Sequence, residues 1–551
     1  MPKTTRCAAI VGLAISAAAS SAHAQLRVCS WNITNYTSGR INEFQTSIYG
    51  VVPALSAGGQ PMALAGQRMA PDIILAQEIR SAAGIINFRN LLNSAPGSPG
   101  DWAATNYIDA PGGDTSFAMF YRTNRVLLVQ NTTIISQGAV DTDGVAPHIP
   151  PRNTERYVVR LAGYNDIATT NLALYNSHMK SGSGVDELRR QTEAPRIAAD
   201  VLALTPGWHA ILGGDFNCTG FTDGGFAPLV GAVNGNPAIQ NGPLYDPIRA
   251  LGGWENNGTF RFIHTQDPGA GKQMDSRFDF VLLSASLRDG VGLDYIGSLS
   301  TPWNLATFND TNHSYRCWGN DGSSFNTSLN IASNTMVGNA IATALQLSAV
   351  GLGHLPVYLD LRVPAKAQAS TTTINFGNVP QNSTQSLTFT VGNSGDVSLW
   401  TVGGIAPLNY SYPAPGSGFT VTQAGAQQTD APGGGVNTHT VTLDTTTAGP
   451  KAGSLIITTN APENPTITIA LAATVGPGGP TRCGRSDIAG PGLSVGFDGE
   501  TTADDIILFV SWFTSGDLRA DFSQPGLIPE PDGELTADDV ITFIGFFTIS
   551  C

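Results

Sequence analysis

The sequence predicts an α/β first region, an all-β second region and a small helical third region. Apolar strand-like runs alternate with helix-like runs over residues 25–363, whereas short alternating strands fill residues 371–475. The last segment, 483–551, contains an internal repeat. A chain of 551 residues is long enough for roughly three or four folding units, which agrees with this division.

The composition favours strands and loops over helical bundles. Gly occurs 63 times and Pro 34 times, while charged residues make up only 13% of the chain. The formal net charge is −14, so a basic protein that wraps nucleic acid in a positive field is excluded.

Residues 1–24 have the pattern of a secretory signal peptide. Lys3 and Arg6 precede an apolar run at 8–19, and the small-residue sequence AHA precedes Gln25. We therefore expect a secreted, extracellular or cell-surface-associated protein. The apolar run is shorter than the ~20 residues that span a bilayer, and no later stretch approaches that length, so no integral membrane segment is expected.

Export permits disulfides between the five cysteines that follow the leader. Cys483 and Cys551 bracket the acidic last segment and are expected to pair. Any pairing among Cys29, Cys218 and Cys317 stays open.

The first region contains seven apolar strand candidates and one long helix candidate at 185–204. The strand candidates cover 26–31, 72–77, 117–121, 172–178, 209–215, 278–284 and 355–361. Connectors are expected at 363–370 and, from its Gly/Pro content, at 476–481. Between them, 371–475 reads as a β-sandwich.

Polar side chains follow several of these strands at the point where each strand ends. They occur in SWN (30–32), QE (77–78), NSH (176–178), GGDFN (213–217), RFD (277–279) and GHLPV (353–357). A single Asn, Asp or His at a strand end is usually a turn residue or a satisfied polar group. Six such ends in one region instead indicate a polar site on the rim of a sheet.

The residue types at this rim suit metal-assisted cleavage of a phosphoester. Asn32 and Glu78 are candidate ligands for Mg²⁺ or Mn²⁺, because these cations prefer oxygen donors. Two further pairs and one more aspartate complete the candidate set. Asp215 and Asn217 can orient water or a phosphate oxygen, His178 and His354 can donate to a phosphoryl oxygen, and Asp279 can hold one imidazole in a useful tautomer.

Residues 25–363 resemble the endonuclease/exonuclease/phosphatase superfamily, which includes pancreatic deoxyribonuclease, abasic-site endonucleases, inositol polyphosphate phosphatases and bacterial sphingomyelinases. The resemblance implies a four-layered α/β sandwich with the active site at one rim of two facing sheets. It implies metal ligation by Asn32 and Glu78, and phosphate contact by Arg122 and His178. It also implies water activation by Asp215, transition-state contact by Asn217 and pairing of Asp279 with His354.

Two positions depart from the family pattern. Gly353 stands where the family has an Asp before the final histidine, and Thr34 stands where some members place a further metal-binding Asp. An altered metal site and a catalytically inactive surface-binding protein are therefore alternatives to an active enzyme.

Nucleic acid is the expected substrate, which makes the protein a secreted metal-dependent phosphodiesterase of the nuclease kind. A lipid or small-molecule phosphoesterase, of sphingomyelinase or inositol-phosphatase type, is the alternative. Contacts to further phosphates are available from Lys180, Arg189, Arg190 and Arg316, although each of them is more often a solvated surface charge.

The repeat at the end of the chain aligns 486–515 with 520–549 at an offset of 34 residues. Each copy is an acidic loop that leads into an amphipathic helix, expected at 504–514 and 538–548. An Asp-Gly pair followed by acidic residues fits a Ca²⁺ loop, and the candidate ligands are Asp487, Asp498, Asp505, Asp521, Asp532 and Asp539. Capping of the two helices by Asp504 and Asp538 explains part of the same pattern.

The two loop-helix units resemble a dockerin of the GC-terminated type, over residues 483–551. This resemblance implies a calcium-binding docking module with a cohesin-like or cell-surface protein as partner. The acidic residues usual at loop positions one and three are absent at Ser494 and Gly496. The middle region resembles immunoglobulin-like sandwich modules and is expected to act as a spacer.

Overall fold

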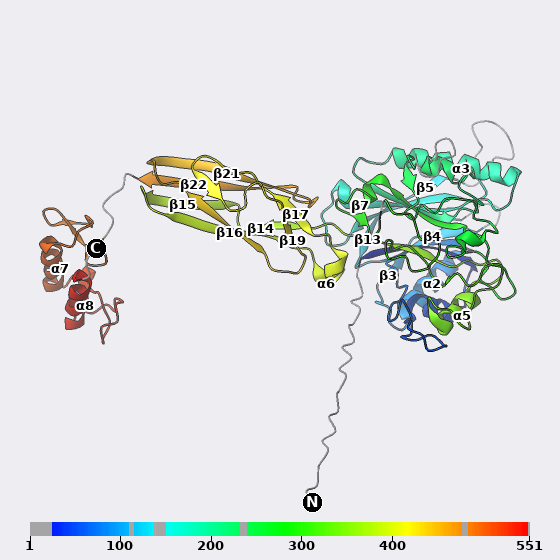
Figure 1. Ribbon diagram of the computed structural model, residues 1–551, viewed down its shortest axis with the longest axis horizontal. Coiled ribbons are helices and arrows are strands. Elements are labelled where there is room, and N and C mark those ends of the chain that lie inside the picture. Colours follow the sequence, from blue (N-terminus) through cyan, green and yellow to red (C-terminus); the bar gives the residue numbers. More distant parts are fainter. Residues whose placement is uncertain are drawn as a thin grey trace, which may run out of the picture.

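The computed structural model describes residues 25–109, 115–136, 138, 150–231, 240–298, 300–476 and 483–548. The predicted leader, 1–24, lies outside these residues. Buried apolar side chains form three clusters, one in each of the three predicted regions, and the first cluster also takes in two side chains of the second region. Figure 1 shows the three parts following one another along the chain.

The first region contains two mixed sheets. The first sheet has the order β11(Asp294–Tyr295), β13(Val357–Arg362), β1(Leu26–Tyr36), β2(Ile73–Ile79), β4(Ser116–Arg122), β3(Trp102–Ala104), and β12(Arg316–Cys317) pairs with β13. The second sheet has the order β5(Val126–Ile135), β6(Thr154–Leu161), β7(Asn171–His178), β8(His209–Asp215), β10(Asp279–Ser284), β9(Leu244–Tyr245). The pairs β1–β2 and β7–β8 are parallel, and the other pairs are antiparallel.

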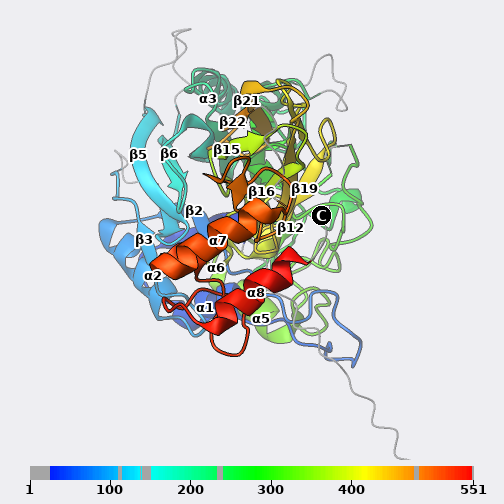
Figure 2. The ribbon, with the colours of Figure 1, turned by 90° about the vertical axis from the view of Figure 1, so that its left-hand side faces the viewer.

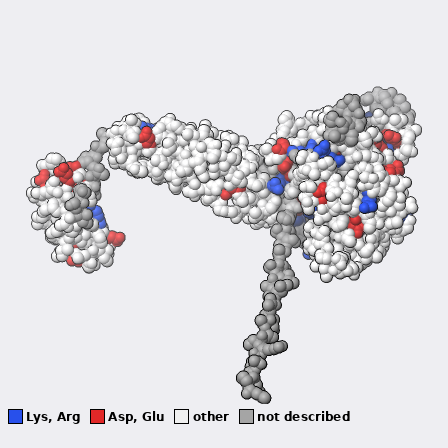
Figure 3. Space-filling model, viewed as in Figure 1, with Lys and Arg blue, Asp and Glu red and all other residues white. Residues whose placement is uncertain are grey.

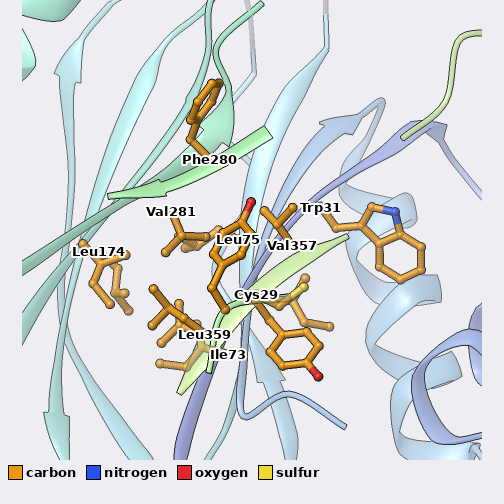
Figure 4. Packing of buried hydrophobic residues seen from close by; sticks show 14 of the residues in the cluster. Cys29, Trp31, Ile73, Leu75, Leu174, Phe280, Val281, Val357 and Leu359 are labelled. Atoms are coloured by element: carbon orange, nitrogen blue, oxygen red, sulfur yellow. The ribbon is translucent and has the colours of Figure 1, made fainter. Parts of the chain in front are cut away.

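The two sheets pack face to face. Every residue of β7 and β8 is buried, which explains why these strands read as continuous apolar runs rather than alternating ones. Figure 4 shows Ile73, Leu75 and Leu359 of the first sheet beside Leu174 and Val281 of the second. The approach is so close at Gly213 that an added Cβ would lie 2.7 Å from Leu75 Cδ1.

Helices cover the outer sides of this pair of sheets. Figure 1 shows α3(Val185–Leu202) on one side and α2(Ala82–Ser94) and α5(Gly338–Ser348) on the other. The remaining helices of this region are α1(Ile41–Tyr49), α4(Ala227–Val230), η1(Ala168–Thr170), η3(Gly258–Phe260) and η4(Ala285–Leu287).

The second region is a pair of packed sheets around its own core. One sheet has the order β14(Ala367–Ala369), β16(Gln385–Asn393), β20(Asn437–Leu443), β18(Phe419–Val421). The other has the order β15(Thr373–Pro380), β22(Thr466–Gly476), β21(Gly449–Thr459), β17(Leu408–Ser411), β19(Gln428–Asp430). Buried and exposed residues alternate along much of β21 and β22, as expected where one face of a strand meets a core and the other meets water. Two short helices, α6(Val397–Trp400) and η5(Val402–Gly404), leave this sandwich toward the first region.

The expected connector at 363–370 is instead a packed junction. Val363, Ala365 and Ala367 are buried, and Val363 pairs with Ile405 in a parallel bridge. The side chain of Trp400 joins the core of the first region and donates from Nε1 to the carbonyl of Ala162 at 3.1 Å. The small apolar side chains of this segment allow this close packing.

The third region is a compact repeat with α7(Ala503–Ser515), α8(Ala537–Phe547), η6(Leu518–Ala520), β23(Ala489–Gly490) and β24(Ser494–Val495). The two long helices lie side by side in Figure 2. The rings of Phe509 and Phe543 stack between them with centroids 4.0 Å apart. Acidic side chains gather on this region in Figure 3. Within the described residues, no helix combines the length and apolarity needed to cross a membrane.

Of the cysteines, Cys483 is disulfide-bonded, and its expected partner Cys551 lies outside the described residues. Cys29, Cys218 and Cys317 are free and buried, which answers the pairing question that the sequence left open.

Candidate active site

The polar strand ends meet at one rim of the two sheets. In the second sheet, the register places His178 opposite Asp215 and Asp215 opposite Asp279, so three strand-end side chains stand on one row. In the first sheet, Asn32 pairs with Gln77, and the ladder shifts register immediately afterwards.

This register shift turns Glu78 toward the rim. Glu78 has a φ of 63°, a conformation that residues with a side chain rarely adopt. A bulge at a strand end changes the direction in which a side chain points, and here it brings the Glu78 carboxylate onto the amide of Asn32. Asn32 Nδ2 donates to Glu78 Oε1 at 3.0 Å, and the backbone N–H of Asn35 donates to Glu78 Oε2 at 2.9 Å.

One carboxylate oxygen, Asp215 Oδ2, is the centre of the cluster. It accepts a hydrogen bond from Asn32 Nδ2 at 3.1 Å, which links the two sheets at the rim. The Nε2 atoms of His178 and His354 lie 3.3 and 3.4 Å from the same oxygen. Asp215 is 1% exposed, so all of these contacts form away from bulk water.

His354 also contacts a second carboxylate, through its other ring nitrogen. Its Nδ1 lies 2.6 Å from Asp279 Oδ2, and both residues are buried. Burial alone would lower the pKa of His354, but the charges of Asp279 and Asp215 outweigh it and raise the pKa above the ordinary histidine value. His354 is therefore an imidazolium at neutral pH.

His178 has the opposite protonation state. Burial, with the cations Arg152 and His354 nearby, lowers the pKa of His178 well below its ordinary value. Burial likewise raises the pKa of Asp215, and Asp279 adds to this effect while His354 opposes it. The site thus combines one charged imidazole, one neutral imidazole and a carboxylate of increased basicity.

Asn217 supports Asp215 from the adjoining loop. Its backbone N–H donates to Asp215 Oδ1 at 3.1 Å, and its Nδ2 donates to the carbonyl of Met179 at 3.1 Å. Seven of the eight residues that the sequence singled out for this site are therefore brought together by the structure.

Arg122 is the exception. It lies at the far end of β4, where it pairs in register with Trp102, and its backbone N–H donates to Asp72, just before β2 begins. Its guanidinium forms ion pairs with Asp72 and Asp101. Because Glu78 stands at the opposite end of β2, Arg122 is a structural residue of the other rim.

A buried polar layer lies directly beneath the site. Gln77 Nε2 donates to Asn176 Oδ1 at 2.8 Å and to Ser30 Oγ at 3.2 Å, which joins the two sheets. Each of these residues belongs to one of the strand-end motifs, next to or two positions before a site residue. In the sequence, each of them is a polar residue that interrupts an apolar strand shortly before the strand ends.

Arg152 is the site-adjacent cation that sequence reasoning missed. Its Nη1 donates to the carbonyls of His178 and Met179 at 3.3 and 3.4 Å. It precedes β6 rather than ending a strand, so no strand-end pattern indicated it. By contrast, Arg190, considered above for phosphate contact, is buried in an ion pair with Asp223.

The two departures from the family pattern have local explanations. A Cβ added to Gly353 would lie 2.5 Å from the Cα of Ala349, so the backbone leaves no room for a side chain there. Thr34 has a φ of 51°, and its backbone N–H donates to Asn32 Oδ1 at 3.0 Å. That bond fixes the orientation in which the Asn32 amide meets the two carboxylates.

The carboxylates of Glu78 and Asp215 offer oxygen atoms to a single hard divalent cation, whereas Asn32 turns its Nδ2 toward both carboxylates and keeps its Oδ1 on the N–H of Thr34. Glu78 and Asp215 place carboxylate oxygens around the amide of Asn32, and Mg²⁺ typically takes one or two carboxylates while keeping water or substrate oxygens as its other ligands. Among the described residues, no group of three or more His, Cys, Asp or Glu side chains is arranged to hold a metal. A metal bound here would therefore take most of its ligands from water and substrate.

No family model matches the sequence, and no curated protein matches it. Similar solved structures include an endonuclease/exonuclease/phosphatase family protein from Bacteroides thetaiotaomicron, with 15% identity and a TM-score of 0.33, covering 61% of this chain and 94% of the other. The human Nocturnin catalytic domain has 15% identity and a TM-score of 0.31, covering 62% and 95%. A mannosyl-6-phosphatase from B. thetaiotaomicron has 16% identity and a TM-score of 0.33, covering 61% and 99%. Because these identities and scores are low, the geometry of the site carries the functional proposal.

Proposed function

We propose that the first region is a divalent-metal-dependent phosphodiesterase that hydrolyses nucleic acid. The observation that carries the proposal is the environment of Asp215 Oδ2, which lies within 3.4 Å of Asn32 Nδ2, His178 Nε2 and His354 Nε2. A buried carboxylate beside an imidazolium–carboxylate pair and oxygen donors for a cation is a complete set for hydrolysis of a phosphoester.

In the proposed reaction, Asp215 accepts the proton of the attacking water. Its raised pKa makes it a stronger base than an exposed aspartate. The new P–O bond forms to the water oxygen, the P–O bond to the leaving oxygen breaks, and the leaving oxygen takes a proton from solvent water to become a hydroxyl. A Mg²⁺ or Mn²⁺ held by the carboxylate of Glu78, and by Asn32 with its amide turned so that Oδ1 replaces Nδ2 at this position, would neutralise charge on the phosphate.

The two histidines have different roles. The imidazolium of His354, held by Asp279, stabilises the charge that develops on the phosphoryl oxygens. The neutral His178 orients the carboxylate of Asp215 and donates to the phosphate when substrate displaces that contact. Asn217 keeps the carboxylate fixed through its backbone N–H.

Basic residues beside the site support a polyanionic substrate. Arg80 follows Glu78 by two residues and is exposed, Lys180 follows His178 by two residues, and Arg152 contacts the carbonyl of His178. These positions suit the phosphates on either side of a scissile one. The leader at 1–24 supports export, so the proposed substrate is extracellular DNA or RNA.

A substrate panel tests this proposal. The mature protein is incubated with DNA, RNA, sphingomyelin and an inositol polyphosphate, with Mg²⁺ or Mn²⁺ and with chelator. We expect metal-dependent release of nucleotide fragments and at least tenfold slower turnover of the lipid and the inositol phosphate.

Turnover of only sphingomyelin or inositol polyphosphate would replace the nuclease with a lipid or small-molecule phosphoesterase. If no substrate is turned over, the result would favour the alternative that Gly353 suggested, a catalytically inactive binding protein.

A further inference from the structure

The carboxylates expected to bind calcium in the C-terminal repeat are engaged elsewhere. Asp505 is fully buried, and its Oδ1 accepts hydrogen bonds from the backbone N–H groups of Ile488 and Ala489, both at 2.7 Å. Its Oδ2 accepts from the N–H of Thr502 at 2.7 Å, which completes the capping box of α7.

The second copy repeats this arrangement 34 residues later. Asp539 Oδ1 accepts from the N–H groups of Phe522 and Ser523 at 2.7 and 2.8 Å, and its Oδ2 accepts from Thr536 at 2.7 Å. These bonds lower the pKa of Asp539 below its ordinary value, although burial opposes the shift. Two independent copies with the same geometry make a chance arrangement untenable.

A second carboxylate in each copy closes the acidic loop. Asp487 Oδ1 accepts from the N–H of Asp498 at 3.1 Å, and its Oδ2 accepts from that of Gly499 at 3.0 Å. The equivalent Asp521 accepts from Asp532 and Gly533 at 3.1 and 2.6 Å.

Each of the remaining two expected ligands accepts a hydrogen bond from a backbone N–H of its own turn. Asp498 Oδ1 accepts from the N–H of Glu500, and Asp532 Oδ1 accepts from that of Glu534. Protein-bound Ca²⁺ takes six to eight oxygens, roughly 2.3–2.6 Å away. Both oxygens of Asp487, Asp505, Asp521 and Asp539, and one oxygen each of Asp498 and Asp532, accept from backbone N–H groups. The described residues contain no cluster of three acidic, His or Cys side chains arranged for a metal.

We infer that backbone amides take the place of calcium in this repeat, so that the module folds and keeps its shape without the ion. Asp505 and Asp539 tie the first residues of each copy to the start of its helix, and Asp487 and Asp521 close the loop between them. Hydrogen bonds to a charged carboxylate are about twice as strong as neutral ones, which explains how buried acidic residues are retained without a cation.

Hydrogen–deuterium exchange of the full mature chain tests this inference. Exchange of the amides of Ile488, Ala489, Phe522 and Ser523 is measured in chelator and in millimolar Ca²⁺. We expect rates that agree within twofold between the two buffers. Protection that rises tenfold or more with Ca²⁺ would overturn the inference.

A matched pair of variants separates the carboxylate bonds from general acidity. Asp539→Ala should increase exchange at Phe522 and Ser523 by at least tenfold in both buffers, whereas Glu534→Gln, an exposed acidic neighbour, should not. If Asp539→Ala leaves these rates unchanged in chelator, the hydrogen bonds do not hold the loop and the inference fails. Calorimetric titration of the wild type with Ca²⁺ should show no stoichiometric binding, and saturable binding lost in Asp539→Ala would contradict it.

Discussion

At the scale of single residues, the site depends on placing similar groups in different surroundings. His354 has two carboxylates near it and is charged, whereas His178 faces two cations and is neutral. The sequence indicated both histidines because each lies at or beside the end of an apolar strand. It gave no indication of their protonation states, because these depend on burial and on charges that the fold brings together, such as Asp279 for His354 and Arg152 for His178.

Asp279→Asn should weaken catalysis and change its pH dependence. Asp279 raises the pKa of His354, so the wild type keeps its imidazolium as the pH rises, and the variant loses it at lower pH. We expect kcat/KM to fall by about 10²–10⁴-fold and its alkaline limb to move to lower pH.

Rates on one DNA substrate from pH 5 to 10 measure this effect, with the exposed Asp289→Asn as control. An alkaline limb in the same place as in the wild type would contradict the role of Asp279.

Glu193, in α3, should make the fold less stable as the pH rises. It is fully buried, neither carboxylate oxygen has a hydrogen-bond partner among the described residues, and burial raises its pKa to about 8. Between the ordinary carboxyl pKa of 4.5 and about 8, the unfolded chain releases a proton that the folded chain keeps, so stability falls across this window. Glu193→Gln removes this titration and should stabilise the protein at pH 8 by about 2–4 kcal/mol, with no gain at pH 4.5.

Urea unfolding at the two pH values measures the difference, and the exposed Glu187→Gln is the control. A variant that loses stability with pH as steeply as the wild type would show that Glu193 is not the titrating group.

At the scale of elements, strand ends could be predicted and backbone geometry could not. Apolar runs that end in polar residues are visible in the sequence, and β1, β2, β7, β8 and β10 all carry a site residue at or near the rim. The bulge at Glu78 and the missing space at Gly353 depend on packing between distant segments. Arg122 follows an apolar run as the site residues do, but β4 runs antiparallel to β2, so its end lies at the other rim.

Placing a carboxylate at position 353 with Gly353→Asp should not increase activity. The new Cβ would meet the Cα of Ala349, so we expect a loss of stability of about 1–3 kcal/mol, as for other overpacked sites. Gly353→Ala carries the same Cβ without the carboxylate and should lose about as much.

Thermal unfolding and kcat of the two variants are compared with the wild type. A gain in activity specific to Gly353→Asp would mean that the backbone relaxes and that a metal-binding carboxylate had been lost from this site.

At the scale of the whole molecule, the first two regions share a packed junction. The sequence indicated a connector at 363–370, where the first region ends, but Val363, Ala365 and Ala367 are buried there. Trp400 occupies the core of the first region, and Lys366 forms an ion pair with Glu463 at 3.1 Å. The β-sandwich thus packs against the first region and contributes to its core.

Trp400→Ala should uncouple the two regions. Removing a fully buried tryptophan leaves a cavity, at a cost of about 3–5 kcal/mol. We expect differential scanning calorimetry to show one shared transition for these regions in the wild type and two in the variant.

The exposed neighbour Val402→Ala should keep the shared transition. A single transition at an unchanged temperature in Trp400→Ala would show that the junction contributes little.

The most direct test of the central claim is the rate of DNA or RNA cleavage by Asp215→Asn relative to the wild type and to Asp289→Asn, in Mg²⁺ or Mn²⁺. Asn keeps the size of the side chain and removes the base, so the fold should be preserved while the rate falls by at least 10³-fold, about 4 kcal/mol in activation free energy. Cleavage by Asp215→Asn at a rate close to that of the wild type would contradict the assignment of this cluster as the active site.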